Sequence, residues 1–163
     1  MTITGLLRIQ HSGFGRILEE MGESLKDFEG CAGEELERSL LKLLPALRVH
    51  ERIEHELLFP AFIKHVASVD PGILDLFKGT HKEIHEKVDA LQEVLKDKGA
   101  LLSRMVTAAD FISLAKEHFE QEEQTLFPLF EKGVPEDIQK ELGRRASEYA
   151  HSRSERKHIG GPT

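Results

Sequence analysis

Apolar residues recur along most of the chain at alternating steps of three and four, the spacing that places side chains on one face of an α-helix. The first such stripe runs from Ile3 to Phe28, and the second runs from Leu36 to Ala61. The third extends from about Leu74 to Leu95, and the fourth carries Met105 to Thr125 before an expected end near Gly133. No segment alternates with a period of two, so the sequence predicts helices and no β-strand.

Helix-breaking residues separate these stripes. Gly30, Ala32 and Gly33 are expected to end the first helix, Asp70-Pro71-Gly72 the second and Lys98-Gly99 the third. Four amphipathic helices of roughly 25 to 35 residues with short connections predict an all-α fold, an antiparallel up-and-down four-helix bundle.

The expected boundaries follow from the same breaks. We expect the bundle to span residues 1–133, a short C-terminal helix beside it to span residues 134–150, and a flexible tail to span residues 151–163. The short fifth helix would reach about Tyr149. Pro45 and Pro60 fall inside the second helix, and each is expected to kink it because proline lacks a backbone donor.

Seven side chains that can bind metals stand on the apolar stripes. Six of them form pairs four residues apart, which lie one above the other on a helix and offer two donor atoms to one point. A single histidine on an apolar stripe is ordinarily a hydrogen-bonded core residue. Seven buried polar groups are different, because each costs several kcal/mol unless it is paired or coordinated. The candidate metal ligands are His11, His50, Glu54, His81, His85, His118 and Glu122.

This set is too large for one small cation and suits a pair of transition metals. Imidazole is a preferred donor for iron, zinc, copper and nickel, and a carboxylate has two oxygens with which it can bridge two ions. The sequence lacks HExxH, and it lacks the ExxH of ferritin-like sites in the needed places, which argues against a zinc protease and a ferroxidase. The other histidines stand off the stripes and are expected at the surface or behind the ligands: His55, His65, His151 and His158.

The segment from His50 to Pro60 reappears in part from His118 to Pro128. In both copies a histidine is followed four residues later by a glutamate and then by Leu-Phe-Pro, and matching positions are offset by 68 residues throughout. Such a repeat predicts two similar helix pairs related by an approximate twofold axis. A helix that ends or kinks explains the Leu-Phe-Pro, but it does not explain the preceding histidine and glutamate.

The full order of motifs, a histidine followed by HxxxE, HxxxH and HxxxE with both Leu-Phe-Pro flanks, resembles that of the hemerythrin-like proteins with an HHE cation-binding domain. The resemblance covers about residues 5 to 132. It implies a non-haem di-iron centre inside a four-helix bundle, with a solvent-derived oxo or hydroxo bridge. It further implies that His81, His85 and His118 hold one iron, that His11 and His50 hold the other, and that Glu54 and Glu122 bridge both ions.

The resemblance also implies a function. The iron held by His11 and His50 would have five ligands, and its open position is where the family binds dioxygen or ligands such as azide. Glu122 follows His118 by four residues, whereas the invertebrate oxygen carriers of the family have an aspartate five residues after the histidine. The glutamate variant resembles the bacterial and mycobacterial branch, which includes proteins linked to sensing and to peroxide or nitric oxide chemistry.

Two classes of function are therefore expected. The first is the binding, storage or sensing of dioxygen, and the alternative is a di-iron redox enzyme acting on hydrogen peroxide or nitric oxide. A zinc or mixed-metal bundle without redox function is a third possibility.

Reversible oxygen binding needs a dry, apolar pocket beside the open iron. Gly13 and Gly15 each cost about 1 kcal/mol in a helix interior relative to alanine, so they either leave space near that iron or allow close packing of helices. The acidic residues that flank the two HxxxE motifs are expected mostly at the solvent, with some of them accepting the second ring N–H of a ligating imidazole. They are Glu51, Glu56, Glu117, Glu120 and Glu123. The expected lining residues are Phe14, Gly15, Leu47, Leu57, Phe77, Ile84, Ile112, Ala115 and Phe119.

Composition limits the partners and the location. The formal net charge of −7 argues against nucleic acid and weakly against an anionic membrane surface. No apolar run approaches the roughly 20 residues that cross a bilayer, and the N-terminus does not resemble a secretory signal. Cys31 is the single cysteine, which fits a reducing cytoplasm. We expect a cytoplasmic monomer or weak homo-oligomer, in which the basic stretch from Arg144 is either solvated or docks to an acidic partner.

Overall fold

The computed structural model describes residues 1–26 and 32–156, with the backbone alone for Ala32 and residues 150–156. Among these residues the chain is almost entirely helical and contains no strand. Two short turns, η1 and η2, are π-helical. The elements in chain order are α1 (Ile3–Ser24), α2 (Ala32–Ile53), η1 (Glu54–Leu58), α3 (Phe59–His65), α4 (Gly72–Lys96), α5 (Leu101–Gln121), η2 (Glu122–Leu126), α6 (Phe127–Gly133) and α7 (Glu136–Arg156).

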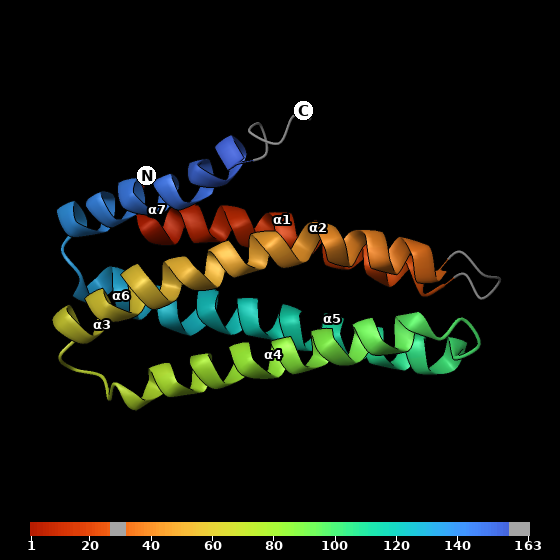
Figure 1. Ribbon diagram of the computed structural model, residues 1–163. Coiled ribbons are helices and arrows are strands. Elements are labelled where there is room, and N and C mark those ends of the chain that lie inside the picture. Colours follow the sequence, from red (N-terminus) through yellow and green to blue (C-terminus); the bar gives the residue numbers. More distant parts are fainter. Residues whose placement is uncertain (27–31, 157–163) are drawn as a thin grey trace.

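Among the described residues, four long helical rods form the bundle: α1, α2 with α3, α4, and α5 with α6 (Figure 1). Helix α1 contacts α2 and α5, α2 also contacts α4, and α4 contacts α5, so the contacts close into a ring. The second rod continues from α2 through η1 into α3, and the fourth continues from α5 through η2 into α6. The predicted all-α four-helix bundle is confirmed.

A fifth helix, α7, packs along α1 and also contacts α2; it is blue beside the red α1 in Figure 1. The sequence predicted that it would be short, but it extends to Arg156 because residues 144–156 contain no glycine or proline to end it. The expected flexible tail therefore begins with helical residues, and its remainder lies outside the described residues.

The boundary between the first two helices also differs from the prediction. Ala32 and Gly33 were expected to end the first helix, but they lie in the first turn of α2. The predicted end near Gly30 lies outside the described residues.

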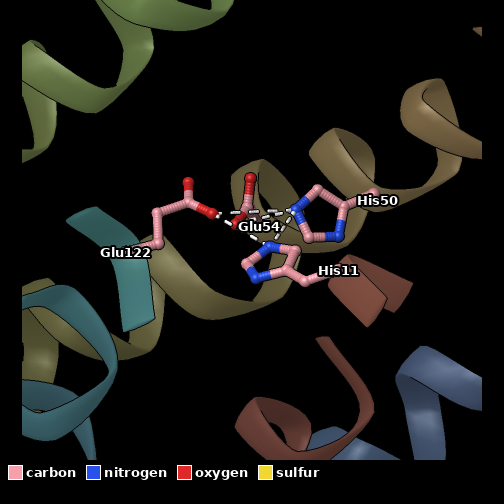
Figure 2. Close-up of side chains that lie close together, drawn as sticks. All are labelled: His11, His50, Glu54 and Glu122. Atoms are coloured by element: carbon pink, nitrogen blue, oxygen red, sulfur yellow. Dashed lines mark hydrogen bonds and ion pairs between the residues drawn. The ribbon is translucent and has the colours of Figure 1, made fainter. Parts of the chain in front are cut away.

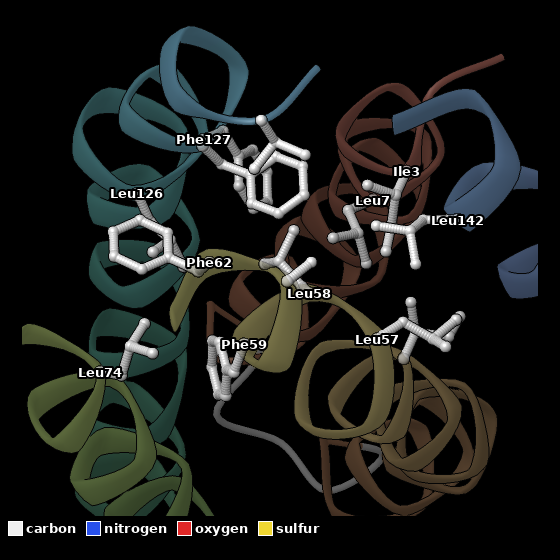
Figure 3. Close-up of a cluster of buried hydrophobic side chains, with 14 of the residues drawn as sticks. Ile3, Leu7, Leu57, Leu58, Phe59, Phe62, Leu74, Leu126, Phe127 and Leu142 are labelled. Atoms are coloured by element: carbon white, nitrogen blue, oxygen red, sulfur yellow. The ribbon is translucent and has the colours of Figure 1, made fainter. Parts of the chain in front are cut away.

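In the part of the chain that the structure describes, the core consists of two hydrophobic clusters. Fully burying one large apolar side chain stabilises the fold by about 1.5–3 kcal/mol. Each cluster contains many such side chains, so both contribute strongly to the stability of the bundle. The α3/α6 cluster, drawn in part in Figure 3, joins α3 and α6 to the start of α1 and to α7. Its members are Ile3, Leu7, Ile53, Leu57, Leu58, Phe59, Ala61, Phe62, Val66, Leu74, Phe77, Leu126, Phe127, Phe130, Val134, Leu142 and Ala146. The distal cluster consists of Phe14, Leu18, Met21, Leu36, Leu40, Leu43, Leu44, Leu47, Ile84, Val88, Leu91, Ala108, Phe111, Ile112, Ala115 and Phe119.

The two Leu-Phe-Pro segments neither end nor break their helices. A proline ring collides with the carbonyl four residues earlier in an α-helix, and it offers no N–H. Before Pro60 the turn widens instead, and the N–H of Phe59 donates to the carbonyl of Glu54, five residues earlier. The N–H of Phe127, before Pro128, donates to the carbonyl of Glu122 in the same way. A π-turn therefore precedes each proline, and π-turns of this kind are frequent at functional sites. The kink expected at Pro60 stays a prediction.

The π-turns also change which residues face the core. The α-helical phase predicted Thr125 on the buried face, but Thr125 is exposed and Leu126 and Phe127 are buried. The extra residue in the turn rotates the rest of the helix. The prediction for Thr125 was therefore wrong for a local reason, the widened turn that starts at Glu122.

Replacing Gly143 with alanine is expected to loosen α7. A Cβ on Gly143 would meet the carbonyl oxygen of Met1 and would lie 2.8 Å from the backbone carbonyl carbon of Thr2. Backbone atoms cannot rotate away as a side chain can, so α7 would have to shift, and such overpacking typically costs about 1–3 kcal/mol. Urea unfolding measures the change.

The control for this prediction is Gly22→Ala in α1, where an added Cβ meets nothing within 4 Å. This change is expected to raise the free energy of unfolding by up to about 1 kcal/mol, because alanine favours a helix more than glycine does. Stabilisation by both substitutions would show that α7 does not depend on close contact with the start of α1.

Candidate metal centre

The candidate ligands form a polar layer between the two hydrophobic clusters. On α1, His11 lies between Leu7 of the α3/α6 cluster and Phe14 of the distal cluster. On α4, His81 lies in the same way between Phe77 and Ile84. The helices therefore bring their polar residues to one level of the bundle, where they are shielded from water.

Four of the predicted residues meet in one group, shown in Figure 2. Nε2 of His11 lies 3.2 Å from Nε2 of His50 and 3.2 Å from Oε2 of Glu122. Nε2 of His50 lies 3.3 Å from Oε1 of Glu54. One donor atom from each residue lies within 4.8 Å of the others, which is close enough for a shared metal ion.

A second group lies beside the first and shares Glu122 with it. It consists of His81, His118 and Glu122. Nε2 of His118 lies 3.0 Å from Oε1 of Glu122, and Nε2 of His81 lies 3.2 Å from Oε2 of Glu54. Each of the two carboxylates therefore extends from one group of imidazoles to the other.

His85 is the one predicted ligand that does not join either group. Its Nε2 lies 2.7 Å from Oε2 of Glu51 on α2, and its side chain is 41% exposed. Glu51 was expected mostly at the solvent, but it is buried because α4 covers its side of α2.

Several atoms of the two groups are buried without a hydrogen bond. They are both carboxylate oxygens of Glu54 and of Glu122, Nε2 of His81 and both ring nitrogens of His118. Most of them lie 3.0–3.8 Å from atoms of opposite charge, but not in the orientation of a donor that points at an acceptor. A buried polar atom without a partner costs about 1–3 kcal/mol, and such atoms are rare. Nε2 of His11 and Nε2 of His50 contact each other, but the atoms named above converge on a common space without bonding to one another, which fits a bound cation.

Charge interactions within the layer are strong. Burial disfavours a charge on His50, but Glu54 and Glu122 outweigh it and raise the pKa of His50 to about 10. Burial also opposes a charge on His81, but Glu122 and Glu54 raise its pKa to about 9. Burial likewise opposes a charge on both carboxyls, yet the surrounding imidazoles lower the pKa values of Glu54 and Glu122. Without a metal, His50 and His81 are thus imidazolium groups that face the carboxylates of Glu54 and Glu122.

Three imidazoles are held from behind through Nδ1. Nδ1 of His11 lies 2.8 Å from a carboxylate oxygen of Glu123, as the sequence led us to expect for a flanking acid. Nδ1 of His81 lies 3.0 Å from Nε2 of His55, which agrees with the prediction that His55 lies behind the ligands. Such contacts fix the ring so that Nε2 faces the centre.

Sequence reasoning missed the corresponding partner of His50. Nδ1 of His50 lies 2.9 Å from Oε1 of Gln10 on α1. Helical phase gave no signal for Gln10, since the residue before His11 points about a quarter turn away from it. The contact arises because α2 packs on that side of α1.

Aromatic rings cover the imidazole of His11. Phe119 stacks on it with ring centroids 4.6 Å apart, and Phe14 lies 6.4 Å away. Both were predicted as lining residues. Phe127, which was not, stacks on the same imidazole at 5.5 Å. Its position depends on the π-turn before it, which α-helical periodicity does not reveal.

A surface pocket of about 290 Å³ reaches the outer side of His11. Gly15 and Phe119 line it together with charged groups that include Lys116 and Glu123. An added Cβ on Gly13 or Gly15 would meet nothing within 4 Å, so neither glycine serves close helix packing. The structure thus favours the other expectation for Gly15, that it leaves space near the centre.

Two further findings concern the chain as a whole. No helix among the described residues has an apolar stretch long enough to cross a membrane. The model of one protein family, the hemerythrin HHE cation-binding domain, matches residues 2–139, which include all seven candidate ligands. No curated protein and no solved structure matched the chain.

Proposed function

Because this chain belongs to the hemerythrin HHE cation-binding domain family, we propose that it is a non-haem di-iron protein that binds dioxygen or a related small ligand. Binding would serve the storage, carriage or sensing of oxygen. The lone cysteine of the sequence is in keeping with a cytoplasmic location for such a protein.

The proposed ligands follow the two groups of donor atoms. His11 and His50 would hold one iron, and His81 and His118 would hold the other, with His85 as a further ligand of the second. Glu54 and Glu122 would be shared between the two ions. The geometry of Glu122 supports a bridge, since its Oε2 lies 3.2 Å from His11 and its Oε1 lies 3.0 Å from His118.

The observation that carries the proposal is the set of buried donor atoms without hydrogen bonds. Imidazole nitrogens and carboxylate oxygens together suit iron, and two carboxylates shared by two groups of histidines suit a pair of ions rather than one. Zinc is also compatible with these donors, which is why the metal must be identified by experiment.

Bound reduced iron supplies electrons and a coordination position for dioxygen, and the chain supplies the surroundings. Phe14, Phe119 and Phe127 pack against the imidazole of His11, which is only 6% exposed. Glu123 accepts a hydrogen bond from Nδ1 of His11 when that nitrogen carries the proton, so Nε2 is left with its lone pair facing the centre.

Oxygen binding can be tested by spectroscopy. The iron-loaded protein is reduced without air and then exposed to oxygen. The proposal predicts new visible absorption bands that disappear when oxygen is removed and that reappear in later cycles. Absence of any spectral change on exposure to oxygen would contradict it.

The second candidate is a redox enzyme that acts on hydrogen peroxide or nitric oxide, and the pocket beside His11 is the observation that favours it. The charged and polar residues lining this pocket, which include Lys116, Glu120 and Gln124, suit a polar substrate such as peroxide. Sustained consumption of peroxide or nitric oxide by the iron-loaded protein, with one-way oxidation by oxygen, would support the enzyme over the oxygen-binding protein.

Metal binding at neutral pH is expected to release protons. In the metal-free protein His50 and His81 keep their protons up to about pH 9 to 10, whereas a metal requires the unprotonated nitrogen. Because both pKa values are raised, metal affinity should rise as the pH rises toward 10 and level off above it. A pH indicator in weak buffer measures the release while zinc is added to the metal-free protein. If no protons appear at neutral pH, the two imidazoles are not charged there.

A further inference from the structure

His85 differs from the other candidate ligands in its exposure. Its side chain is 41% exposed, whereas the side chains of His50, Glu54, His118 and Glu122 are at most 1% exposed. The groups of donor atoms that could hold a metal ion contain the other six residues and not His85. In this structure His85 therefore lies outside the polar layer.

The ring of His85 is also reversed relative to its neighbours. His11, His50 and His81 turn Nδ1 toward a residue behind them and Nε2 toward the carboxylates. In His85 it is Nε2 that meets a residue outside the centre, 2.7 Å from Oε2 of Glu51. Nε2, the nitrogen that faces the centre in the other rings, thus contacts Glu51 in His85.

Glu51 depends on this contact. The residue is 8% exposed, and its Oε1 is buried without a hydrogen bond. His85 gives Glu51 its one hydrogen bond among the described residues. A buried carboxylate is costly without a partner, so Glu51 favours the outer position of His85.

The inner position is nevertheless close by. His85 follows His81 by four residues on α4, so the two side chains leave the same side of the helix one turn apart. Because side chains occupy discrete staggered rotamers, we infer that a rotamer change of His85, without movement of α4, carries its imidazole from Glu51 to the side of His81.

We propose that His85 is an exchangeable ligand and that Glu51 is the residue that positions it. With His85 on Glu51, the metal that His81 and His118 would hold lacks this imidazole, and a small anion such as azide would bind in its place. With His85 turned inward, the imidazole would exclude the anion. This inference rests on the proposed function and deepens it, because it places a second ligand-binding position on the metal that the family pattern would leave saturated.

Nitrogen NMR of the histidines in the zinc-loaded full-length protein tests the inference, since zinc is diamagnetic. In the unaltered protein, Nε2 of His85 is expected to show the shift of a hydrogen-bonded nitrogen and not of a metal-bound one. In Glu51→Gln, the charge that holds the ring is lost, and Nε2 is expected to move to the metal-bound shift. Azide added to this variant should return His85 to the unbound shift.

The control is Glu86→Gln, which removes an exposed carboxylate next to His85 that contacts Lys82. It should leave the shift of His85 unchanged. A metal-bound His85 in both the unaltered protein and Glu51→Gln would show a permanent ligand, and an unbound His85 in both would show that it is no ligand. Either result overturns the inference.

Zinc content separates this inference from the proposed function. If the unaltered protein does not take up two zinc ions per chain, the proposed two-metal centre fails. If it does, His85→Ala is expected to retain both ions, because the remaining six donors hold them. If His85→Ala loses one zinc ion while the unaltered protein keeps two, the proposal that His85 is exchangeable is overturned, and the proposed two-metal centre stands.

Discussion

Glu122→Gln is expected to lower the metal content of the protein from two ions per chain to one or none. Glu122 lies against histidines of both groups, with Nε2 of His11, His50, His81 and His118 at 3.0–3.8 Å from its oxygens. Glutamine keeps the shape of the side chain but removes the charge and one metal-binding oxygen. A single amide oxygen cannot bridge two cations as a carboxylate does. Metal analysis after dialysis against a weak chelator measures the loss.

The matched control for this substitution is Glu120→Gln, two residues earlier in α5. Glu120 is exposed and accepts a hydrogen bond from Gln124. The control should keep the full metal content. If Glu122→Gln binds as much metal as the control, Glu122 does not bridge and the ligand assignment is wrong.

Phe127→Ala is expected to weaken both the fold and the metal centre. The side chain of Phe127 is fully buried in the α3/α6 cluster, and its ring stacks on His11 with centroids 5.5 Å apart. Removing such a ring typically costs about 3–5 kcal/mol of unfolding free energy. It also removes a surface that holds the His11 imidazole in place, so metal affinity should fall by about 10- to 100-fold, as for other residues that orient a ligand. Urea unfolding and a metal titration measure the two effects.

Phe130→Ala separates the two effects of Phe127. Phe130 is as deeply buried in the same cluster, and among the described residues it makes no ring contact with a histidine. The Phe130→Ala variant should lose a comparable amount of unfolding free energy while keeping its affinity for metal. Equal losses of affinity in both variants would mean that the stacking on His11 has no separate role.

The bundle and the six residues that cluster in the polar layer could be predicted, because both depend on helical periodicity. Steps of three and four define the buried face of a helix, and pairs such as His50 with Glu54 then point to one place. Six of the seven predicted residues do come together in the polar layer. Whether they bind metal is the prediction that experiment must decide.

The structure differs from the sequence-based prediction at residues whose position depends on contacts between helices or on a local change of helical pitch. The burial of Glu51 depends on the approach of α4, and the role of Gln10 depends on the approach of α2. The exposure of Thr125 and the stacking of Phe127 follow from the π-turn at Glu122. Helical phase within one segment contains none of this information. The repeated Leu-Phe-Pro marked the two places, but it did not reveal that the turn widens.

The central claim is that the polar layer holds two metal ions, and a count of metal per chain tests it most directly. Protein expressed with iron supplied is purified without chelator, and iron, zinc and protein are quantified in the same sample. The two shared carboxylates predict two metal ions per chain, predominantly iron. A content below about one ion per chain, unchanged after iron is added to the reduced protein, would contradict a two-metal centre.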